Sequence, residues 1–202
     1  TRLSETVLAG NNTLNLLDAV DWKSGDHIFV TSTSFDPLET EERYIDSVSD
    51  DGRTITLTQR LYFEHLGDGY WDETGEIVPE YRAEVGLLTR NVVVQGDEQS
   101  KSQQFGGQIV FASSQIWDNP IIGRLSNVEV RNAGQGLKLG KYPIHFHMVG
   151  IVDKSYVMNC TVHSANNRAI AIHGVNQLRV TWNVVFNTRG HAIFIEDGTE
   201  VR

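Results

Sequence analysis

The chain has little cysteine and proline, and it lacks a long apolar run. Its 202 residues include 1 cysteine and 4 prolines. The lone Cys160 excludes an internal disulfide framework, and its inward position in a repeated segment favours a buried structural thiol over a nucleophile. No stretch approaches the roughly 18 apolar residues of a membrane-spanning helix, so we expect no membrane contact from this fragment.

Basic residues are also few, and they are unevenly placed. The chain has 17 Lys and Arg against 26 Asp and Glu, a net charge of −9. Residues 1–123 carry 8 basic and 21 acidic side chains, whereas residues 124–202 carry 9 and 5. The acidic part argues against nucleic acid as a partner, while the mildly basic part tolerates an anionic polymer.

A short apolar pattern occurs three times in the basic part. Ile144–His147, Ile170–His173 and Ile193–Glu196 align without gaps. Because side chains alternate between the faces of a strand, one face is apolar in every copy. The opposite face carries two rows of side chains: His145, Ala171 and Phe194, and beside them His147, His173 and Glu196. The apolar face indicates core, whereas a column of two histidines and a carboxylate needs another explanation.

A second set of repeats starts at Asn127, Asn159 and Asn183, at spacings of 32 (159 − 127) and 24 (183 − 159). The longer interval holds an extra segment, residues 134–142. We expect each repeat to hold two short strands, with Gly150, Gly174 and Gly198 closing the second one. A period in the low twenties with short β runs is typical of a parallel β-helix, which buries its inner face only by stacking coils.

The remaining sequence predicts β hairpins and no long helix. Strands over residues 43–48 and 54–58 flank an Asp-Asp-Gly turn, and residues 62–82 look like a long loop. The predicted fold is therefore all-β. Residues 1–90 form a hairpin-rich cap or first irregular coils, and residues 91–202 form a right-handed parallel β-helix, truncated at its carboxyl end.

Several longer segments resemble a known group, the fibrocystin-L and cell-surface hyaluronidase superfamily. They are residues 22–26, 32–36 with 39–42, 82–92, 141–147 and 190–198. The resemblance implies a right-handed parallel β-helix that follows a small glycine-containing β domain, in an extracellular or cell-surface protein. Some members of the group bind and depolymerise hyaluronan, whereas others look like surface receptors or coat components. Fold transfers across such a family more readily than activity does.

The polar column is a candidate catalytic and metal site. On adjacent coils, neighbouring side chains would lie about 5 Å apart. Two imidazoles and a carboxylate at that spacing can hold a divalent ion, zinc or calcium, with a position open for water. The candidate ligands are His145, His147, His173 and Glu196. The alternative is a polar ladder on an outward face, covered by a loop.

A sugar-binding side is predicted just before the repeated strands. Tyr142, Arg168 and His191 occupy equivalent positions there, and Lys141 and Arg189 flank them. Cations suit the carboxylates of an acidic polysaccharide such as hyaluronan, and an aromatic ring suits a sugar face. The alternative for this side is a solvated turn.

The predicted catalytic residues are His147, His173, Glu196 and Arg168, and two mechanisms stay open for them. A hydrolase needs two carboxyl groups about 5 to 9 Å apart, and Glu196 has Glu129 or Asp153 as candidate partners. Asp197 is expected to point to the opposite face from Glu196. A lyase would use a base and a cation that neutralises a uronate. A non-enzymatic structural or adhesive segment of a fibrocystin-like surface protein is the alternative function, and the sequence leaves the oligomeric state open.

Overall fold

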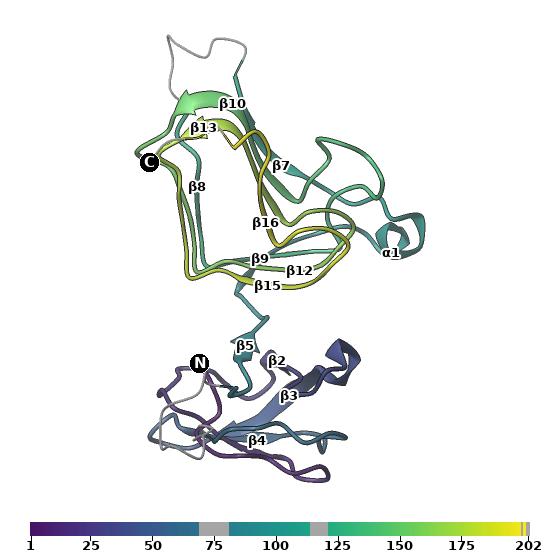
Figure 1. Cartoon of the computed structure of the whole chain (residues 1–202), viewed down its shortest axis with the longest axis vertical. Helices are drawn as coiled ribbons and strands as arrows, with labels where there is room; N and C mark the ends of the chain where they lie inside the picture. The colour runs from purple at the N-terminus through teal and green to yellow at the C-terminus, as the bar shows by residue number, and fades with distance from the viewer. Residues whose placement is uncertain (69–80, 114–120, 199, 201–202) are drawn as a thin grey trace. The chain divides into compact units, whose positions relative to one another are not determined.

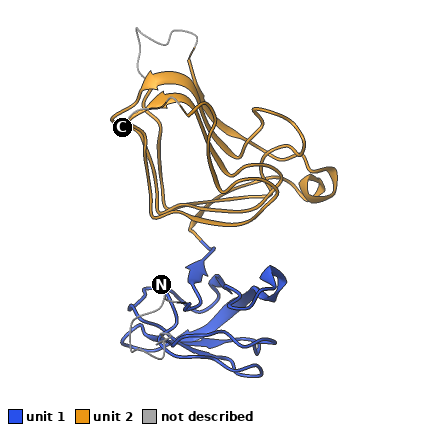
Figure 2. Ribbon diagram, in the orientation of Figure 1, with its two compact units in different colours: residues 1–89 blue, residues 90–202 orange. Residues whose placement is uncertain are grey.

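The computed structural model describes residues 1–68, 81–113, 121–198 and 200. The chain divides into two compact units, Thr1–Thr89 and Arg90–Arg202 (Figure 2). Each unit has its own apolar core. Among the described residues no helix is long and apolar enough to cross a membrane.

The first unit is built on one antiparallel sheet. Its strand order is β1-β4-β3-β2-β5. The elements are β1 (Thr13–Asn15), β2 (His27–Val30), the 3₁₀ helix η1 (Pro37–Glu39), β3 (Glu41–Val48), β4 (Thr54–Leu57) and β5 (Val85–Leu87). The predicted hairpin is confirmed, because β3 pairs antiparallel with β4 across the turn at Gly52, whose φ is +70°. Residues 3–8 form no strand of this sheet, because the segment pairs only through isolated bridges at Leu3 and Val7.

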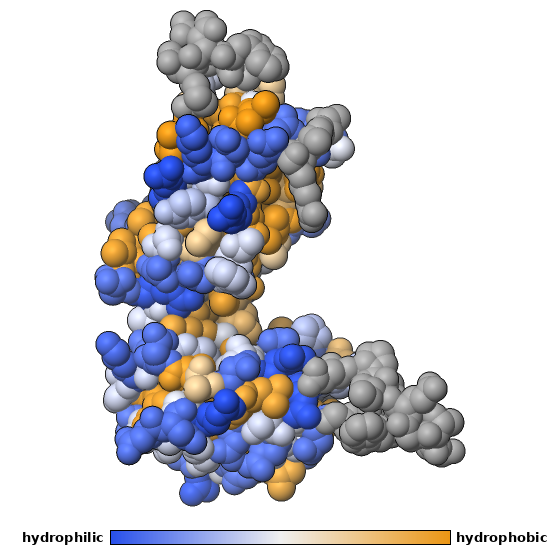
Figure 3. Space-filling view, turned by 90° about the vertical axis from the view of Figure 1, so that its left-hand side faces the viewer, coloured by the Kyte–Doolittle hydropathy of each residue, from blue (hydrophilic) through white to orange (hydrophobic). Residues whose placement is uncertain are grey.

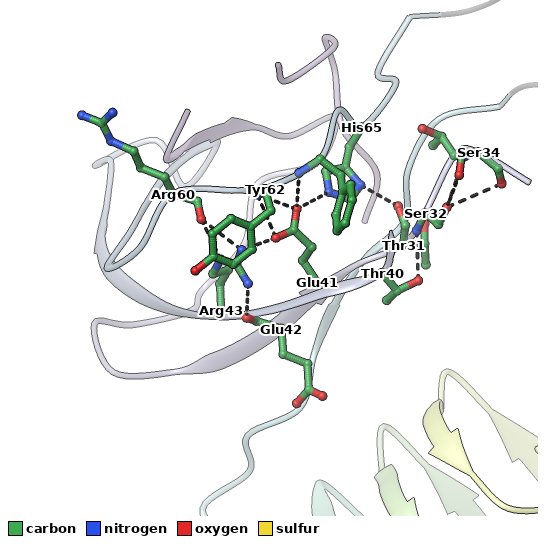
Figure 4. Close-up of polar contacts among 12 residues, drawn as sticks. Thr31, Ser32, Ser34, Thr40, Glu41, Glu42, Arg43, Arg60, Tyr62 and His65 are labelled. Carbon is green, nitrogen blue, oxygen red and sulfur yellow. Dashed lines mark hydrogen bonds and ion pairs between the residues drawn. The ribbon is translucent and has the colours of Figure 1, made fainter. Parts of the chain in front are cut away.

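A buried carboxylate holds the end of this sheet to the chain that follows β4 (Figure 4). Glu41 accepts hydrogen bonds from the backbone amides of Tyr62 and Phe63, each at 2.9 Å, and forms an ion pair with Arg43. His65, which is fully buried, places Nε2 at 3.1 Å from the Glu41 carboxylate and Nδ1 at 2.9 Å from the Thr31 carbonyl. Burial alone would raise the pKa of Glu41, but these hydrogen bonds and the Arg43 charge together hold the pKa below its ordinary 4.5.

The second unit is a parallel β-helix (Figure 1). Its strands pair only in parallel, in three sheets ordered β16-β13-β10-β7, β14-β11-β8 and β15-β12-β9-β6. The strands are β6 (Val92–Gln95), β7 (Ile109–Ala112), β8 (Arg124–Ser126), β9 (Val128–Arg131), β10 (Ile144–Ile151), β11 (Tyr156–Met158), β12 (Thr161–Ala165), β13 (Ile170–Asn176), β14 (Arg179–Thr181), β15 (Val184–Thr188) and β16 (Ile193–Ile195). One short helix, α1 (Gln99–Gln103), lies outside the coil (Figure 1).

A complete coil therefore carries three strands, and the expectation of two is wrong. The additional sheet holds the three-residue strands β8, β11 and β14. Such short strands of mixed burial leave no apolar run to read in the sequence. The glycines also act differently from expectation, because β10 and β13 continue past Gly150 and Gly174. These two residues have φ of +67° and +58°, so the strands bend at the corner instead of ending there.

The first two copies of the predicted apolar ladder lie in the core of the coil, whereas Ile193 and Ile195 of the last copy are exposed. Ile144 pairs with Ile170 and Ile170 with Ile193, and the same register brings Phe146 beside Ile172. The ladder extends one coil further than predicted, because β7 places Phe111 against Phe146 with ring centroids 4.4 Å apart. On the face that Figure 3 shows, hydrophilic and hydrophobic residues are interspersed among the residues drawn in colour.

The second repeat is confirmed between Asn127 and Asn159 but is one residue out of register at Asn183. Thr161 pairs with Val184, a spacing of 23, so Trp182 stands at the position of Asn159. Trp182 adopts the same left-handed backbone, with φ of +55° against +53° for Asn159. Asn183 instead caps the neighbouring coil, accepting from the Cys160 amide and donating to the Val157 carbonyl, both at 2.9 Å.

Candidate functional site

The predicted polar column lies on the outer face of the β16-β13-β10 sheet. Strand pairing sets His147 directly beside His173. Glu196 follows the end of β16, and its amide donates to the Ile172 carbonyl at 2.9 Å, which continues the ladder by one residue. The three side chains therefore share one face, as the repeat predicts.

The histidines approach one another closely. His147 Nδ1 and His173 Nδ1 are 3.0 Å apart, and Glu196 Oε2 lies 3.8 Å from the same His173 nitrogen. One ligating nitrogen from each of His145, His147 and His173 lies within 4.8 Å of the others, so the three could hold a metal ion. The sequence pattern thus brings together the residues predicted as metal ligands.

His145 is the most enclosed member of the cluster, at 3% exposure. Its Nδ1 lies 3.1 Å from the Gly140 carbonyl, which can only accept, so Nδ1 carries the proton. Its Nε2 is buried and has no hydrogen-bond partner. Burial lowers the pKa of His145 below 6.5, and the neighbouring His147 and His173 act in the same direction. A neutral imidazole with a free Nε2 lone pair follows from this environment.

The cover over His145 comes from the extra segment, residues 134–142. Asn167 Nδ2 donates to the backbone carbonyls of Gln135 and Lys138, both at 2.8 Å, and Asn166 Nδ2 reaches the Gly134 carbonyl at 3.4 Å. These two asparagines therefore fix the loop that carries the Gly140 carbonyl. Sequence reasoning missed them, and the signal available was an Asn pair between two repeated strands.

Asp197 is a second residue that the sequence reasoning misplaced. It was expected to point away from Glu196, yet its Oδ2 lies 3.2 Å from His173 Nε2. The reason is that β16 ends at Ile195, so the alternation of a regular strand does not extend to Asp197. Both carboxylates consequently approach the same imidazole from different sides of its ring.

A basic groove opens beside the cluster in the same unit. Its volume is about 900 Å³, and the residues that line it include Lys138, Arg168, Arg189 and His191 but no Asp or Glu. Three of these four residues, Arg168, Arg189 and His191, were predicted to bind substrate or to act in catalysis. Lys141 lies elsewhere, lining a neighbouring hollow of about 520 Å³ with Asp97 and Phe105.

Arg168 is held in place by aromatic side chains. Its Nη1 donates to the Tyr142 hydroxyl at 2.8 Å, and its guanidinium carbon lies 3.7 Å from the centroid of the Phe194 ring. Tyr142 is only 1% exposed, so its ring is covered and not open to a sugar face as predicted. Tyr142 instead links the two parts of the site, because its ring also meets His145 edge-on at 4.9 Å.

The predicted carboxylate partners of Glu196 do not join it. Glu129 is buried on β9, in a different sheet, where it contacts His163 at 3.1 Å and Arg131 at 3.0 Å. Burial would raise the pKa of Glu129, but these partners and the Arg90 amide hold the pKa below 4.5. Asp153 lies with apolar residues of β13 and β16 around another hollow. Asp197, in contrast, shares a partner with Glu196, because both carboxylates approach the His173 ring.

Comparison with known proteins identifies relatives of this chain. The family described as CEMIP beta-helix matches residues 104–202. Fibrocystin-L of Mus musculus is 39% identical over 235 residues, covering 99% of this chain and 6% of the relative. Cell surface hyaluronidase CEMIP2 of Homo sapiens is 35% identical over 211 residues, covering 94% of this chain and 14% of the relative. The chain thus spans only a small part of these relatives, and the resemblance expected from the sequence is confirmed.

Solved structures resemble the chain more distantly. The tailspike protein gp49 from Pseudomonas phage LKA1 has a TM-score of 0.33 and 17% identity, covering 93% of this chain and 37% of that chain. The Gp54 tailspike of Acinetobacter baumannii bacteriophage AP22, solved with a capsular saccharide, has a TM-score of 0.32 and 14% identity, covering 91% and 33%. Likeness at this level does not bear on the ligand of this chain.

Proposed function

Because residues 104–202 belong to the CEMIP β-helix family and the whole chain is related to fibrocystin-L and to a cell-surface hyaluronidase, we propose that it binds and depolymerises an acidic polysaccharide. Hyaluronan or a glycan of similar charge is the proposed substrate. The relatives also support an extracellular or cell-surface location for the protein.

The basic groove is the observation that carries this proposal. Three Lys or Arg side chains and His191 line it without a carboxylate, in a chain whose net charge is −9. A local excess of positive charge in an acidic protein is suited to repeated carboxylates along a polymer. Arg168 is oriented by Tyr142 and Phe194, so a bound uronate would meet a guanidinium already held in one position.

The histidine cluster is the proposed site of chain cleavage. His145, His147 and His173 would hold a divalent ion, with Glu196 near enough to complete the set. Such an ion supplies either an activated water or neutralisation of a uronate carboxylate. His147, His173 and Glu196 line the outer face of the sheet, and Arg168 precedes the same strand β13 as His173, so groove and cluster are linked through one strand.

The test is hyaluronan binding and size analysis with matched arginine variants. Arg168→Gln removes a groove charge, whereas Arg179→Gln makes the same change on an exposed residue of β14, outside the groove. Losing a charge-assisted hydrogen bond of about 1.4 kcal/mol weakens binding about tenfold. We expect this loss of hyaluronan affinity for Arg168→Gln and not for Arg179→Gln. We also expect the unaltered chain to shorten hyaluronan, and a chelator to abolish the shortening. Equal hyaluronan affinities of the two variants would refute the groove as the binding site.

A structural or adhesive segment is the second candidate function. The stacked ladders of isoleucine and phenylalanine account for the coil without any site, and fibrocystin-L is among the relatives. This function predicts that hyaluronan is neither bound nor shortened, and that replacing His147 or His173 changes only stability. Retained binding without shortening would favour an adhesive, glycan-binding coil.

A further inference from the structure

We propose that His145, His147 and His173 form a three-imidazole site selective for a zinc-like transition ion over calcium, and that Asp197 is the positioning residue that fixes the His173 tautomer. This inference rests on the metal site included in the proposed function, and it names the ion class and a residue outside the predicted ligand set. It is argued from the buried His145 Nε2, which has no hydrogen-bond partner, and from the contacts that orient the His145 and His173 rings.

The donor atoms select the class of ion. Calcium takes six to eight oxygen ligands, whereas imidazole nitrogen suits zinc and its neighbours in the transition series. Three histidine nitrogens lie within 4.8 Å of one another, and Glu196 places one carboxylate oxygen 3.8 Å from His173 Nδ1, the nitrogen that faces His147. Three nitrogens with one further position match zinc sites that keep a place for water or substrate.

The backbone sets the tautomer of His145. Its Nδ1–H donates to the Gly140 carbonyl, which leaves the lone pair on Nε2. Nε2 is buried without a partner, and burying an unpaired polar atom costs free energy unless a ligand satisfies it. A metal ion meeting this nitrogen removes that cost. Gly140 itself has φ of +77°, a conformation that favours glycine, so the loop shape that presents this carbonyl is built into the sequence.

Asp197 does for His173 what the Gly140 carbonyl does for His145. Its carboxylate lies 3.2 Å from His173 Nε2, and this contact favours the tautomer that carries its proton on Nε2 and its lone pair on Nδ1. That Nδ1 faces His147 Nδ1 at 3.0 Å. A carboxylate behind a ligating histidine is the usual way in which proteins orient the ring and raise its basicity.

The spacing of the two facing nitrogens also fits. Metal–nitrogen bonds of about 2.0 to 2.1 Å in a tetrahedral site place neighbouring ligand nitrogens about 3.3 Å apart. His147 Nδ1 and His173 Nδ1 need to separate by only a few tenths of an ångström from 3.0 Å to reach that value. Two lone pairs cannot face each other at this distance without a proton or a cation between them.

Cobalt is the probe for this site, because Co²⁺ in a tetrahedral nitrogen-rich site absorbs visible light. Tag-free full chain is titrated with Co²⁺, and then with Zn²⁺ or Ca²⁺ as competitor. We expect one Co²⁺ per chain, displacement by Zn²⁺ and no displacement by excess Ca²⁺. No visible band, or displacement by Ca²⁺, would overturn the assignment of the ion class. Hyaluronan binding by the groove is measured separately without metal. Failure of the metal site and failure of glycan binding can therefore be told apart.

Asp197 is tested with two variants and a matched control. Asp197→Asn and Asp197→Ala should lower Co²⁺ affinity about 10- to 100-fold, while Asp153→Asn, on an exposed residue outside the cluster, should leave it unchanged. Imidazole ¹⁵N shifts report the tautomer directly. We expect His173 to carry its proton on Nε2 in the unaltered chain and to gain the Nδ1–H form in Asp197→Ala. Unchanged affinity and an unchanged tautomer in both variants would refute the positioning role.

Discussion

Replacing Glu41 by Gln should cost the first unit about 3 kcal/mol of unfolding free energy at pH 7. The carboxylate is buried and accepts from two backbone amides, from Arg43 and from His65. Glutamine keeps the shape but has one accepting oxygen, and its amide group then faces other donors. Breaking one side of a buried ion pair costs about 3 to 5 kcal/mol. The lower end of this range applies here because glutamine retains part of the hydrogen bonding of Glu41.

The same substitution should change the acid sensitivity of the unit. Because the pKa of Glu41 in the folded chain lies below its ordinary 4.5, the folded state binds the proton less readily than the unfolded state. The stabilisation is therefore complete above the unfolded pKa and is lost as the pH falls through the folded pKa. Between about pH 5 and the folded pKa, the unaltered chain should lose stability more steeply than Glu41→Gln.

Hydrogen exchange followed by mass spectrometry in a urea series separates the two units. Peptides from β2 to β4 report the first unit, and peptides from β10 to β13 serve as the internal reference. The control is Asp46→Asn, which removes a carboxylate from an exposed position of the same strand and should cost less than 0.5 kcal/mol. If Glu41→Gln and Asp46→Asn give parallel pH curves and equal midpoints, the network does not stabilise the sheet.

Two smaller predictions concern the β-helix. Cys160 should resist iodoacetamide at pH 8 in the folded chain and react in urea, because it is fully buried and burial raises the pKa of its thiol; labelling of the folded chain would contradict this. Asn167→Ala should cost about 1 to 2 kcal/mol and speed amide exchange in residues 134–142, because three backbone carbonyls lose a donor. Unchanged exchange in that segment would show that other contacts hold the loop.

The coil could be predicted from sequence where identical residue types recur with strict alternation. Ile144, Ile170 and Ile193 fix the register of one sheet, because a slip of one residue would turn every core side chain to the outside. The sheet of β8, β11 and β14 escaped prediction because three residues are too few to show a period.

The misplaced Asn183 has a physical cause. The corner needs a left-handed backbone, which asparagine adopts more readily than most residues, so aligning asparagines is a reasonable guess. In the last coil Trp182 takes this conformation, with φ of +55°, and its side chain is largely exposed. The neighbouring Asn183 then serves as a cap through its side chain. Residue preference alone therefore does not locate such a corner, because here a tryptophan takes the left-handed position and asparagine stands one residue later.

The candidate site likewise has one part that the sequence predicts and another part that it does not. The column of His147, His173 and Glu196 follows from strand alternation and was predicted. The Gly140 carbonyl and Asp197 act from a loop and from the bend after β16, where alternation gives no direction. Sequence periodicity therefore finds groups on strands and misses the groups that orient them.

The repeat also separates the proposed glycan-binding residues from the proposed metal ligands along the strand. Arg168 lies two residues before β13 begins, and His173 is the fourth residue within it. The pairing of β10, β13 and β16 repeats this separation between groove and cluster residues. Groove residues such as Arg168 and His191 therefore form one row across the coils, and cluster residues such as His147 and His173 form another. A polymer lying along the groove line would keep its acidic groups on cations while its chain passes the histidines. Variants at one line should therefore leave the other intact, so that glycan affinity and metal affinity vary independently.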